Sequence, residues 1–379
     1  MESNAYLLLE DGRRFDGLSV GATDLAVGEV VFNTCMTGYQ EILTDPSYTG
    51  QLVTMTYPMI GNYGVTDEDE ESEGPRVSGF IMREASRRYS SWRAEGGMGA
   101  YLGEHGVAGI ADIDTRALTR HIRSHGAMRG AIASADTPED EVMERIRAHP
   151  LMEGLDLAGG VSTRASYDIP AVGEERFHVL AYDFGVKAHS PKLLAERGCR
   201  VTVIPADTPV AEVVAAAPDG LFVSNGPGDP AAVGEARDAI VELAKAGVPV
   251  FGICLGLQLI SRAFGAETYK LPFGHHGGNH PVKNLERGTV EITAQNHGFA
   301  VRTGDDGTIP GAPDLHLTHV NLYDQTVEGI EHDTLPVFAV QYHPEAAPGP
   351  HDSRYLFDRF VSLMEKRKGA QVPTAQRLP

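Results

Sequence analysis

A cysteine lies between two glycines in the stretch Gly252-Ile-Cys254-Leu-Gly256, directly after the apolar run 248–251. This G-x-C-x-G spacing is that of a nucleophile elbow, in which small residues on either side let the chain turn sharply from a strand into a helix. The turn exposes the sulfur, and the positive end of the helix dipole stabilises a thiolate. We interpret Cys254 as a nucleophile. The alternative is a small core residue, which is the commoner role of a free cysteine.

A thiol nucleophile requires a base, and among the fifteen histidines His343 is the best placed. It closes the apolar segment 336–342, so it lies at the end of a predicted strand, as Cys254 does. Glu345 follows two positions later, and residues i and i+2 of an extended chain project to the same side, so its carboxylate can orient the imidazole. Pro344 ends the strand because it cannot extend a central ladder. Without this context, a His-Pro-Glu sequence is more often a surface turn.

Acyl transfer also requires backbone donors for the oxyanion. The N–H of Leu255, directly after the nucleophile, is one candidate. The stretch 224–230, Ser-Asn-Gly-Pro-Gly-Asp-Pro, contains the other, because Gly226 and Gly228 leave the backbone bare and Gly228 can offer its N–H. The alternative is a simple Pro/Gly turn, which is the commoner meaning of such a stretch.

Strands and helices alternate from residue 177 onward, and these elements have to position the groups above. Strand candidates FHVLAYDF, RVTVIPA, GLFVSNG and VPVFGIC alternate with helix candidates at 189–197, 209–216, 231–246 and 256–264. Such alternation predicts βαβ units, and therefore an α/β domain with a mainly parallel sheet. Ligands bind beyond the carboxyl ends of parallel strands, which is where Cys254 falls.

The first 150 residues differ in texture from the rest of the chain. Short apolar or β-branched runs, separated by Gly, Pro, Asn and Asp, predict a smaller β-rich domain, with the acidic stretch 66–74 as a solvated loop. We therefore predict an N-terminal domain over 1–150, a connecting segment over 151–176, an α/β domain over 177–370 and a loose tail over 371–379.

Composition limits the classes of partner. The 379 residues carry a formal net charge of −20, which would repel a phosphate backbone, so we expect no nucleic-acid partner. No apolar stretch approaches the roughly 18 residues of a membrane helix, and the N-terminus lacks the pattern of a signal peptide. Only three cysteines occur, and Cys35 and Cys199 lack the frame of Cys254. We expect these two to be structural, and the protein to be cytoplasmic, without a membrane.

Longer stretches around these groups resemble a known family. FGICLGLQL, FVSNGPGDP and QYHPEA are similar to the class I glutamine amidotransferases. KLPFGHHGGNHPV, TAQNHGFAV, HPEAAPGPHD and the N-terminal FNTCMTGYQEILTDPSYTGQLVTMTYPMIGNYG resemble the small, glutamine-hydrolysing subunit of carbamoyl-phosphate synthase. The resemblance spans about 30–365 and implies a flavodoxin-like amidotransferase domain after the β-rich domain. One departure is the stretch 185–194, GVKAHSPKLL, which differs from the family pattern.

The resemblance also implies roles for single residues. Cys254 attacks the side-chain amide of L-glutamine, His343 relays a proton to the departing ammonia, and Glu345 orients His343. The implied lining of the glutamine site is Leu255, Gln258, Gly226, Gly228, Asn296, Gly298, Phe299 and, from the N-terminal domain, Ser47. A hydroxyl such as that of Ser47 can couple two domains, since clefts between domains are favoured binding places. Without the resemblance, we would interpret Ser47 as an exposed serine in a loop.

A large-subunit partner follows from the same resemblance. The ammonia passes to that carbamoyl-phosphate synthase large subunit, where ATP, Mg²⁺ and bicarbonate are expected, for arginine and pyrimidine biosynthesis. No cofactor is expected in this chain, which has no Walker sequence. Two alternatives stay open. One is a stand-alone thiol hydrolase or peptidase on the same scaffold, and the other is an inactive regulatory subunit.

Several histidines need separate consideration. His275, His276 and His280 suggest a metal site, but no Cys or acidic residue lies at the spacings typical of zinc, and Gly277-Gly278 suggests a loop shaped for close packing. We therefore predict no metal. For His297, beside the predicted glutamine site, a supporting hydrogen bond and a packing role remain equally open.

Overall fold

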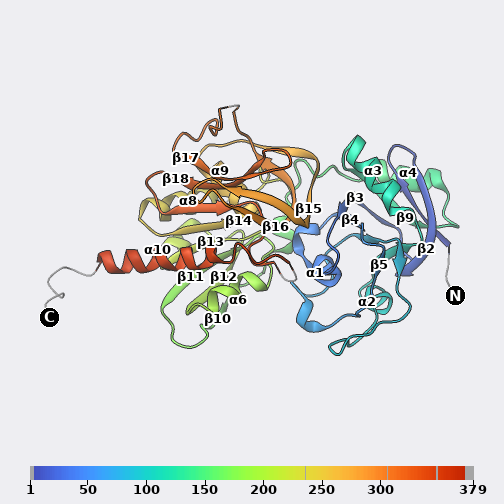
Figure 1. Ribbon diagram of the computed structural model, residues 1–379, viewed down its shortest axis with the longest axis horizontal. Helices are drawn as coiled ribbons and strands as arrows, with labels where there is room; N and C mark the ends of the chain where they lie inside the picture. Colours follow the sequence, from blue (N-terminus) through green and yellow to red (C-terminus); the bar gives the residue numbers. More distant parts are fainter. Residues whose placement is uncertain (1–3, 235, 305, 347–348, 372–379) are drawn as a thin grey trace.

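The computed structural model describes residues 4–234, 236–304, 306–346 and 349–371, and it contains two domains that lie side by side (Figure 1). The N-terminal domain is a closed barrel. In barrel order, its strands are β1 (Asn4–Leu9), β2 (Arg14–Gly21), β8 (Ala108–Ala111), β6 (Gly79–Ile81), β4 (Gln51–Met55), β3 (Ala26–Asn33) and β9 (Met128–Ser134). Around the barrel lie α1 (Tyr39–Thr44), α2 (Met98–Glu104), α3 (Thr115–His125), α4 (Glu139–Ala148), the short helices η1 (Pro46–Tyr48) and η2 (Asp67–Asp69), and the strand pair β5 (Met59–Ile60) and β7 (Glu84–Ala85).

Most strands of the barrel wall are buried on both sides, and β2 is an exception in which only Phe15 is buried. Leu7 of β1 and Ile110 of β8 belong to one buried cluster to which every strand of the barrel contributes, so this cluster fills the interior. Tyr6 and Leu8, which project to the other side of β1, pack against Val142 of α4. Burial on both sides explains why these short strands read as continuous apolar runs.

The second domain is built on a 10-stranded sheet. Its central strands are parallel, in the order β12 (Cys199–Pro205), β11 (Phe177–Asp183), β13 (Gly220–Val223), β14 (Val250–Ile253) and β19 (Val337–Val340). The sheet continues in antiparallel fashion through β18 (Val327–His332), β17 (Leu315–Asn321), β15 (Thr268–Asn284) and β16 (Val290–Val301). The prediction of an α/β domain with parallel strands, preceded by a smaller β-rich domain, is confirmed.

Helices cover both faces of this sheet. On one face pack α7 (Val210–Ala215), α8 (Ala236–Lys245) and α9 (Leu255–Ala263), together with the short α5 (Ala158–Val161). On the other face pack α6 (His189–Ala195) and α10 (Tyr355–Gln371). This coverage explains the nearly continuous apolar character of the central strands. None of the described helices combines the length and the apolar character needed to span a membrane.

Three expectations from the sequence need correction. Segment 151–176 is more than a connection, because β10 (Tyr167–Ile169) pairs with β12 at the edge of the sheet. Gly277 lies in strand β15, at a register shift, and not in a loop. The acidic stretch 66–74 is not wholly solvated, because Glu71 is 1% exposed. Residues 372–379 of the predicted tail lie outside the described residues.

Candidate active site

Cys254 lies at a sharp turn between β14 and α9. Its φ of 56° is in the left-handed region, which residues with a side chain seldom adopt. The flanking glycines leave no room for a side chain, since a Cβ on Gly256 would lie 2.1 Å from the carbonyl oxygen of Val223, and one on Gly252 would lie 2.5 Å from Ile260. The predicted elbow is therefore present. Leu255 is the first residue of α9, where backbone N–H groups have no acceptor within the helix.

His343 follows β19, the neighbour of β14 in the sheet, so it reaches the same edge as Cys254. Its Nδ1 atom is 2.7 Å from the Glu345 carboxylate, and both side chains are buried. This contact places the donor proton on Nδ1 and leaves Nε2 without a hydrogen-bond partner. The thiol of Cys254 donates instead to the carbonyl of Asn296, at 3.4 Å.

Neighbouring charges set the pKa values of His343 and Glu345. Burial alone would lower the pKa of His343, but Glu345 and the neighbouring Cys254 outweigh it and raise that pKa to about 10. Burial would likewise raise the pKa of Glu345, but the charges of His343 and Lys187 lower it to about 2. Because Cys254 contributes to the raised pKa of His343, the imidazolium belongs to the state in which the thiol has passed its proton to Nε2. In that state His343 faces an ionised Glu345 and can give a proton to a leaving group.

A cavity of about 380 Å³ opens at Cys254. It is lined by most of the residues that the sequence assigned to the glutamine site, namely Ser47, Gly226, Gly228, Gln258, Asn296, Gly298 and Phe299, and also by Gln51, Met152, Pro227, His276 and His297. Leu255 is buried beside Cys254 and is not among the lining residues.

The lining side chains are held by hydrogen bonds within the protein. Asn225 donates to the hydroxyl of Ser47 at 3.0 Å, which leaves the proton of that hydroxyl available to a ligand. The amide of Gln258 donates to the carbonyl of Phe299 at 2.8 Å and to Gln341 at 3.0 Å. These contacts fix the polar groups before a ligand arrives, which reduces the entropy cost of binding.

Both domains form the cavity. Ser47 belongs to η1, whereas Asn225 follows β13 of the second domain. A further contact across the junction joins Asn296 to Asp45, at 2.8 Å. A second cavity, of about 440 Å³, also has Asn296 in its wall and reaches His343 and Lys187.

His297 and His276 are both neutral, because burial lowers the pKa of each, to about 3 for His276. His297 donates through Nδ1 to the carbonyl of Phe299 at 2.7 Å, and His276 through Nδ1 to Asn296 at 3.0 Å. Each ring therefore supports a residue that lines the cavity, Phe299 for His297 and Asn296 for His276. For His297, this contact is the supporting hydrogen bond that the sequence left open.

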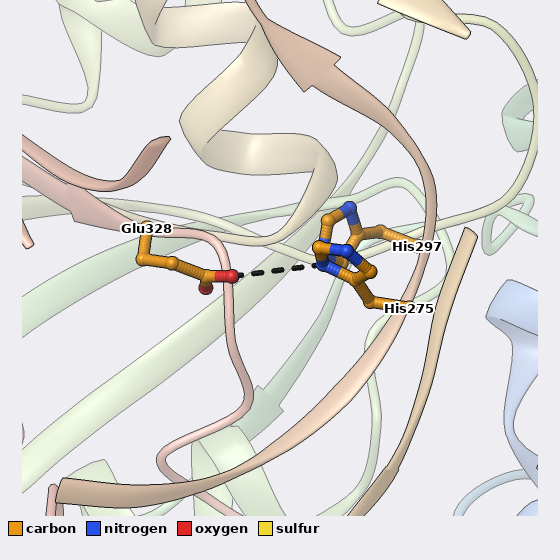
Figure 2. A group of neighbouring side chains, drawn as sticks. All are labelled: His275, His297 and Glu328. Atoms are coloured by element: carbon orange, nitrogen blue, oxygen red, sulfur yellow. Dashed lines mark ion pairs between the residues drawn. The ribbon is translucent and has the colours of Figure 1, made fainter. Parts of the chain in front are cut away.

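A separate group of buried side chains contains His275, His297 and Glu328 (Figure 2). His275 lies 2.9 Å from Asp324 through Nε2 and 3.8 Å from Glu328 through Nδ1. Burial would lower the pKa of His275, but these two carboxylates raise it to about 9. An imidazolium between two carboxylates offsets part of their negative charge. Neither His276 nor His280 belongs to this group.

Cys254, His343 and Glu345 form the predicted catalytic triad. Two charged residues near this triad were not predicted from the sequence. Lys187 lies 3.4 Å from the Glu345 carboxylate and is 8% exposed as a side chain. Glu71 lies 3.5 Å from Lys187 and comes from the N-terminal domain. The one available signal for Lys187 was its position just beyond β11, at the carboxyl edge of the sheet. No local signal pointed to Glu71.

The fold and the site together define a class I glutamine amidotransferase. Residues 180–363 match the family profile described as glutamine amidotransferase class-I. Residues 7–132 match the profile described as carbamoyl-phosphate synthase small chain, CPSase domain.

Relatives named carbamoyl phosphate synthase small chain match almost the whole chain. The one from Chlorobaculum tepidum is 54% identical and covers 97% of this chain and 99% of its own length. Those from a Synechococcus species and from Escherichia coli K12 are 51% and 49% identical, over 97% and 98% of this chain and 95% and 100% of theirs. The chain belongs to the carbamoyl-phosphate synthase small chain family.

Proposed function

We propose that Cys254, His343 and Glu345 perform the reaction of this chain, which is the glutaminase subunit of carbamoyl-phosphate synthase. The observation that supports these roles most directly is the shared position of Cys254 and His343, at the carboxyl ends of the adjacent strands β14 and β19 and next to a cavity lined from both domains. The relatives give no support to a stand-alone peptidase or to an inactive regulatory subunit.

In the first half of the reaction, the thiol of Cys254 passes its proton to Nε2 of His343, and the sulfur attacks the side-chain amide carbon of glutamine. The backbone N–H groups of Leu255 and Gly228 stabilise the oxyanion. As the intermediate collapses, the C–N bond breaks and the nitrogen leaves as ammonia with the proton from His343. A glutamyl thioester on Cys254 remains.

In the second half, a water molecule gives a proton to His343 and attacks the thioester carbon. The C–S bond breaks, the sulfur takes this proton from His343 as glutamate leaves, and Cys254 regains its thiol. Glu345 holds the ring of His343 through Nδ1 and stabilises its charged form in both halves. No step uses a cofactor or a metal.

Groups in the cavity and directly beside it bind L-glutamine. We assign this role to Ser47, Gly226, Gly228, Leu255, Gln258, Asn296, Gly298 and Phe299. The hydroxyl of Ser47 supports the assignment, because its oxygen already accepts a bond from Asn225 and its proton remains free for a ligand.

The ammonia passes to a large subunit. Ammonia in water is mostly protonated at neutral pH and is then not a nucleophile, so an enclosed transfer between the subunits has a chemical purpose. ATP, Mg²⁺ and bicarbonate belong to the large subunit in this proposal, the complex acts in the cytoplasm, and its product serves arginine and pyrimidine biosynthesis.

The direct test is glutamate release by the purified chain and by its Cys254→Ser variant. We expect Cys254→Ser to abolish hydrolysis and also the covalent labelling of the wild-type chain by a glutamine-directed electrophile. Cys199→Ser is the matched control, because Cys199 is buried in the core of the same domain, away from the cavity. Wild-type hydrolysis by Cys254→Ser would overturn the proposed mechanism.

A further inference from the structure

The acidic stretch 66–74 docks onto the second domain through Glu71. The backbone carbonyl of Glu71 accepts from the N–H of Ala188 at 2.9 Å. Its carboxylate lies 3.0 Å from Nδ1 of His189 and 3.5 Å from Nζ of Lys187. Its own N–H donates to Thr44 of α1 at 2.9 Å, so the N-terminal domain holds the residue in place. Glu71 therefore forms a specific contact between the domains, with hydrogen bonds on both sides of the junction.

Lys187 stands between two buried carboxylates. It lies 3.4 Å from Glu345 and 3.5 Å from Glu71, and the side chains of both acids have no exposed surface. Burial would lower the pKa of Lys187, but Glu71 and Glu345 raise it above its usual range. Burial would raise the pKa of Glu71, but Lys187 and His189 lower it. One ammonium charge is thus shared by a carboxylate of the triad and a carboxylate of the other domain.

We propose that Glu71 is a positioning residue for the glutaminase reaction, through which the N-terminal domain sets the proton affinity of His343. The inference rests on the proposed roles of the triad. Because Glu71 also pairs with Lys187, the ammonium group neutralises Glu345 only in part. Glu345 therefore keeps enough negative potential at His343 to orient and stabilise its imidazolium. The amidotransferase domain alone would lack this contribution.

The direction of each effect follows from the charges. Without Glu71, Lys187 pairs with Glu345 alone, so the negative potential at His343 weakens and the imidazolium gives up its proton at lower pH. Without Lys187, Glu71 and Glu345 are left close together without a counter-ion, and such carboxylates cannot both stay ionised. Without both, Glu345 faces His343 with no competing charge.

The other titratable groups near Glu71, Lys187 and the triad are present in every variant. They are Cys254 before α9, Asp45 before η1, Glu41 of α1, and His189 at the start of α6. Because they remain unchanged, differences between variants report on Glu71 and Lys187.

The experiment is a double-mutant cycle on the full chain, with Glu71→Gln, Lys187→Met and the double variant, measured as glutamine hydrolysis against pH. We expect Glu71→Gln to lower kcat by about tenfold, less than the roughly 10²–10⁴-fold contribution of acid–base catalysis itself. It should also move the alkaline limb of kcat/KM to lower pH. The double variant should be more active than Lys187→Met alone, because the uncompensated carboxylate is gone.

Glu70→Gln is the matched control. Glu70 is the neighbour of Glu71 in the same stretch, but it accepts from Tyr101 of its own domain at 2.6 Å. We expect this variant to keep the wild-type pH profile. Circular dichroism of each variant checks the fold.

Two results would separate this inference from the proposed function. If the losses in the cycle are additive and the alkaline limb of Glu71→Gln stays in place, Glu71 is only structural and the inference is wrong, although the triad roles stand. If Cys254→Ser hydrolyses glutamine normally, the triad roles fail, and the inference fails with them.

Discussion

The side-chain amide of Asn296, in the second domain, donates a hydrogen bond of 2.8 Å to the carboxylate of Asp45, in the N-terminal domain. The backbone carbonyl of the same Asn296 accepts from the thiol of Cys254. The other carboxylate oxygen of Asp45 accepts from the N–H of Ser47, at 2.9 Å. One carboxylate of the N-terminal domain therefore holds two residues of the cavity next to Cys254, namely Ser47 in its own domain and Asn296 across the junction.

Asp45→Ala should weaken glutamine binding. The change leaves the buried amide of Asn296 unpaired, at a cost of about 1–3 kcal/mol, and frees the turn that carries Ser47. We expect KM for glutamine to rise by about tenfold, with a smaller change in kcat, in steady-state hydrolysis assays. The control is Asp136→Ala, which removes an exposed carboxylate of the same domain. An unchanged KM would show that the junction does not shape the cavity.

Gly256→Ala should disrupt the elbow. The added Cβ would lie 2.1 Å from the carbonyl oxygen of Val223, in the neighbouring strand, so α9 or β13 must shift. We expect a loss of about 1–3 kcal/mol in the free energy of unfolding, and glutaminase activity reduced by more than tenfold because Cys254 moves with the turn.

Denaturant unfolding and initial rates measure the two effects. Gly160→Ala is the control, because a Cβ there meets no atom within 4 Å. Wild-type stability and rate in Gly256→Ala would contradict the steric argument.

The elbow could be predicted from the sequence because all its parts are adjacent in the chain. The spacing of Gly252, Cys254 and Gly256 by itself requires a tight turn, and the apolar run before it requires a buried strand. His343 and Glu345 could be predicted for a similar reason, because they are only two positions apart, although the structure places them in a turn after β19 and not in an extended segment. The shared edge of the sheet then brought Cys254 and His343 together.

The contacts across the domain junction could not be predicted in this way. Glu71 lies in an acidic run, and such runs are usually solvated, so its burial depends on Lys187, a residue distant in the sequence. The histidines of β15 gave a similar difficulty. The sequence grouped His275 with His276 and His280. The rings of His275 and His280 lie 5.1 Å apart between centroids, but the bulged strand β15 also brings His275 to His297 and Glu328, which the sequence did not indicate. Pairing between strands, and not local spacing, decides such neighbours.

The ion pairs of His275 should make stability depend on pH. Its pKa in the folded protein, about 9, is above the usual 6.5, so the stabilisation is fully present below pH 6.5 and is lost as pH rises through 9. A shift of this size corresponds to about 3 kcal/mol. Glu328→Gln removes one of the two carboxylates, so we expect it to lower the unfolding free energy more at pH 6 than at pH 9.5.

Asp333→Asn is the control for this prediction. It breaks the His316–Asp333 pair, which has a distance of 2.7 Å but is exposed, and exposed pairs contribute little. If Glu328→Gln destabilises the protein equally at both pH values, the loss comes from packing and hydrogen bonds, and not from the charge of His275.

Removal of metal ions should leave both activity and stability unchanged. The imidazolium of His275, which Figure 2 shows beside Glu328, already supplies a positive charge between Glu328 and Asp324. The carboxylate of Glu328 also accepts from Asn321 and from Gln295, each at 2.8 Å, so its oxygens have partners without a cation.

We therefore expect the purified chain to show the same glutaminase rate and melting temperature before and after dialysis against EDTA. Elemental analysis should find less than one equivalent of zinc per chain. One equivalent of zinc that is retained by the wild-type chain and lost in Glu328→Gln would contradict this prediction. It would mean that a cation takes the place of the proton on Nδ1 of His275, because the same nitrogen cannot hold both.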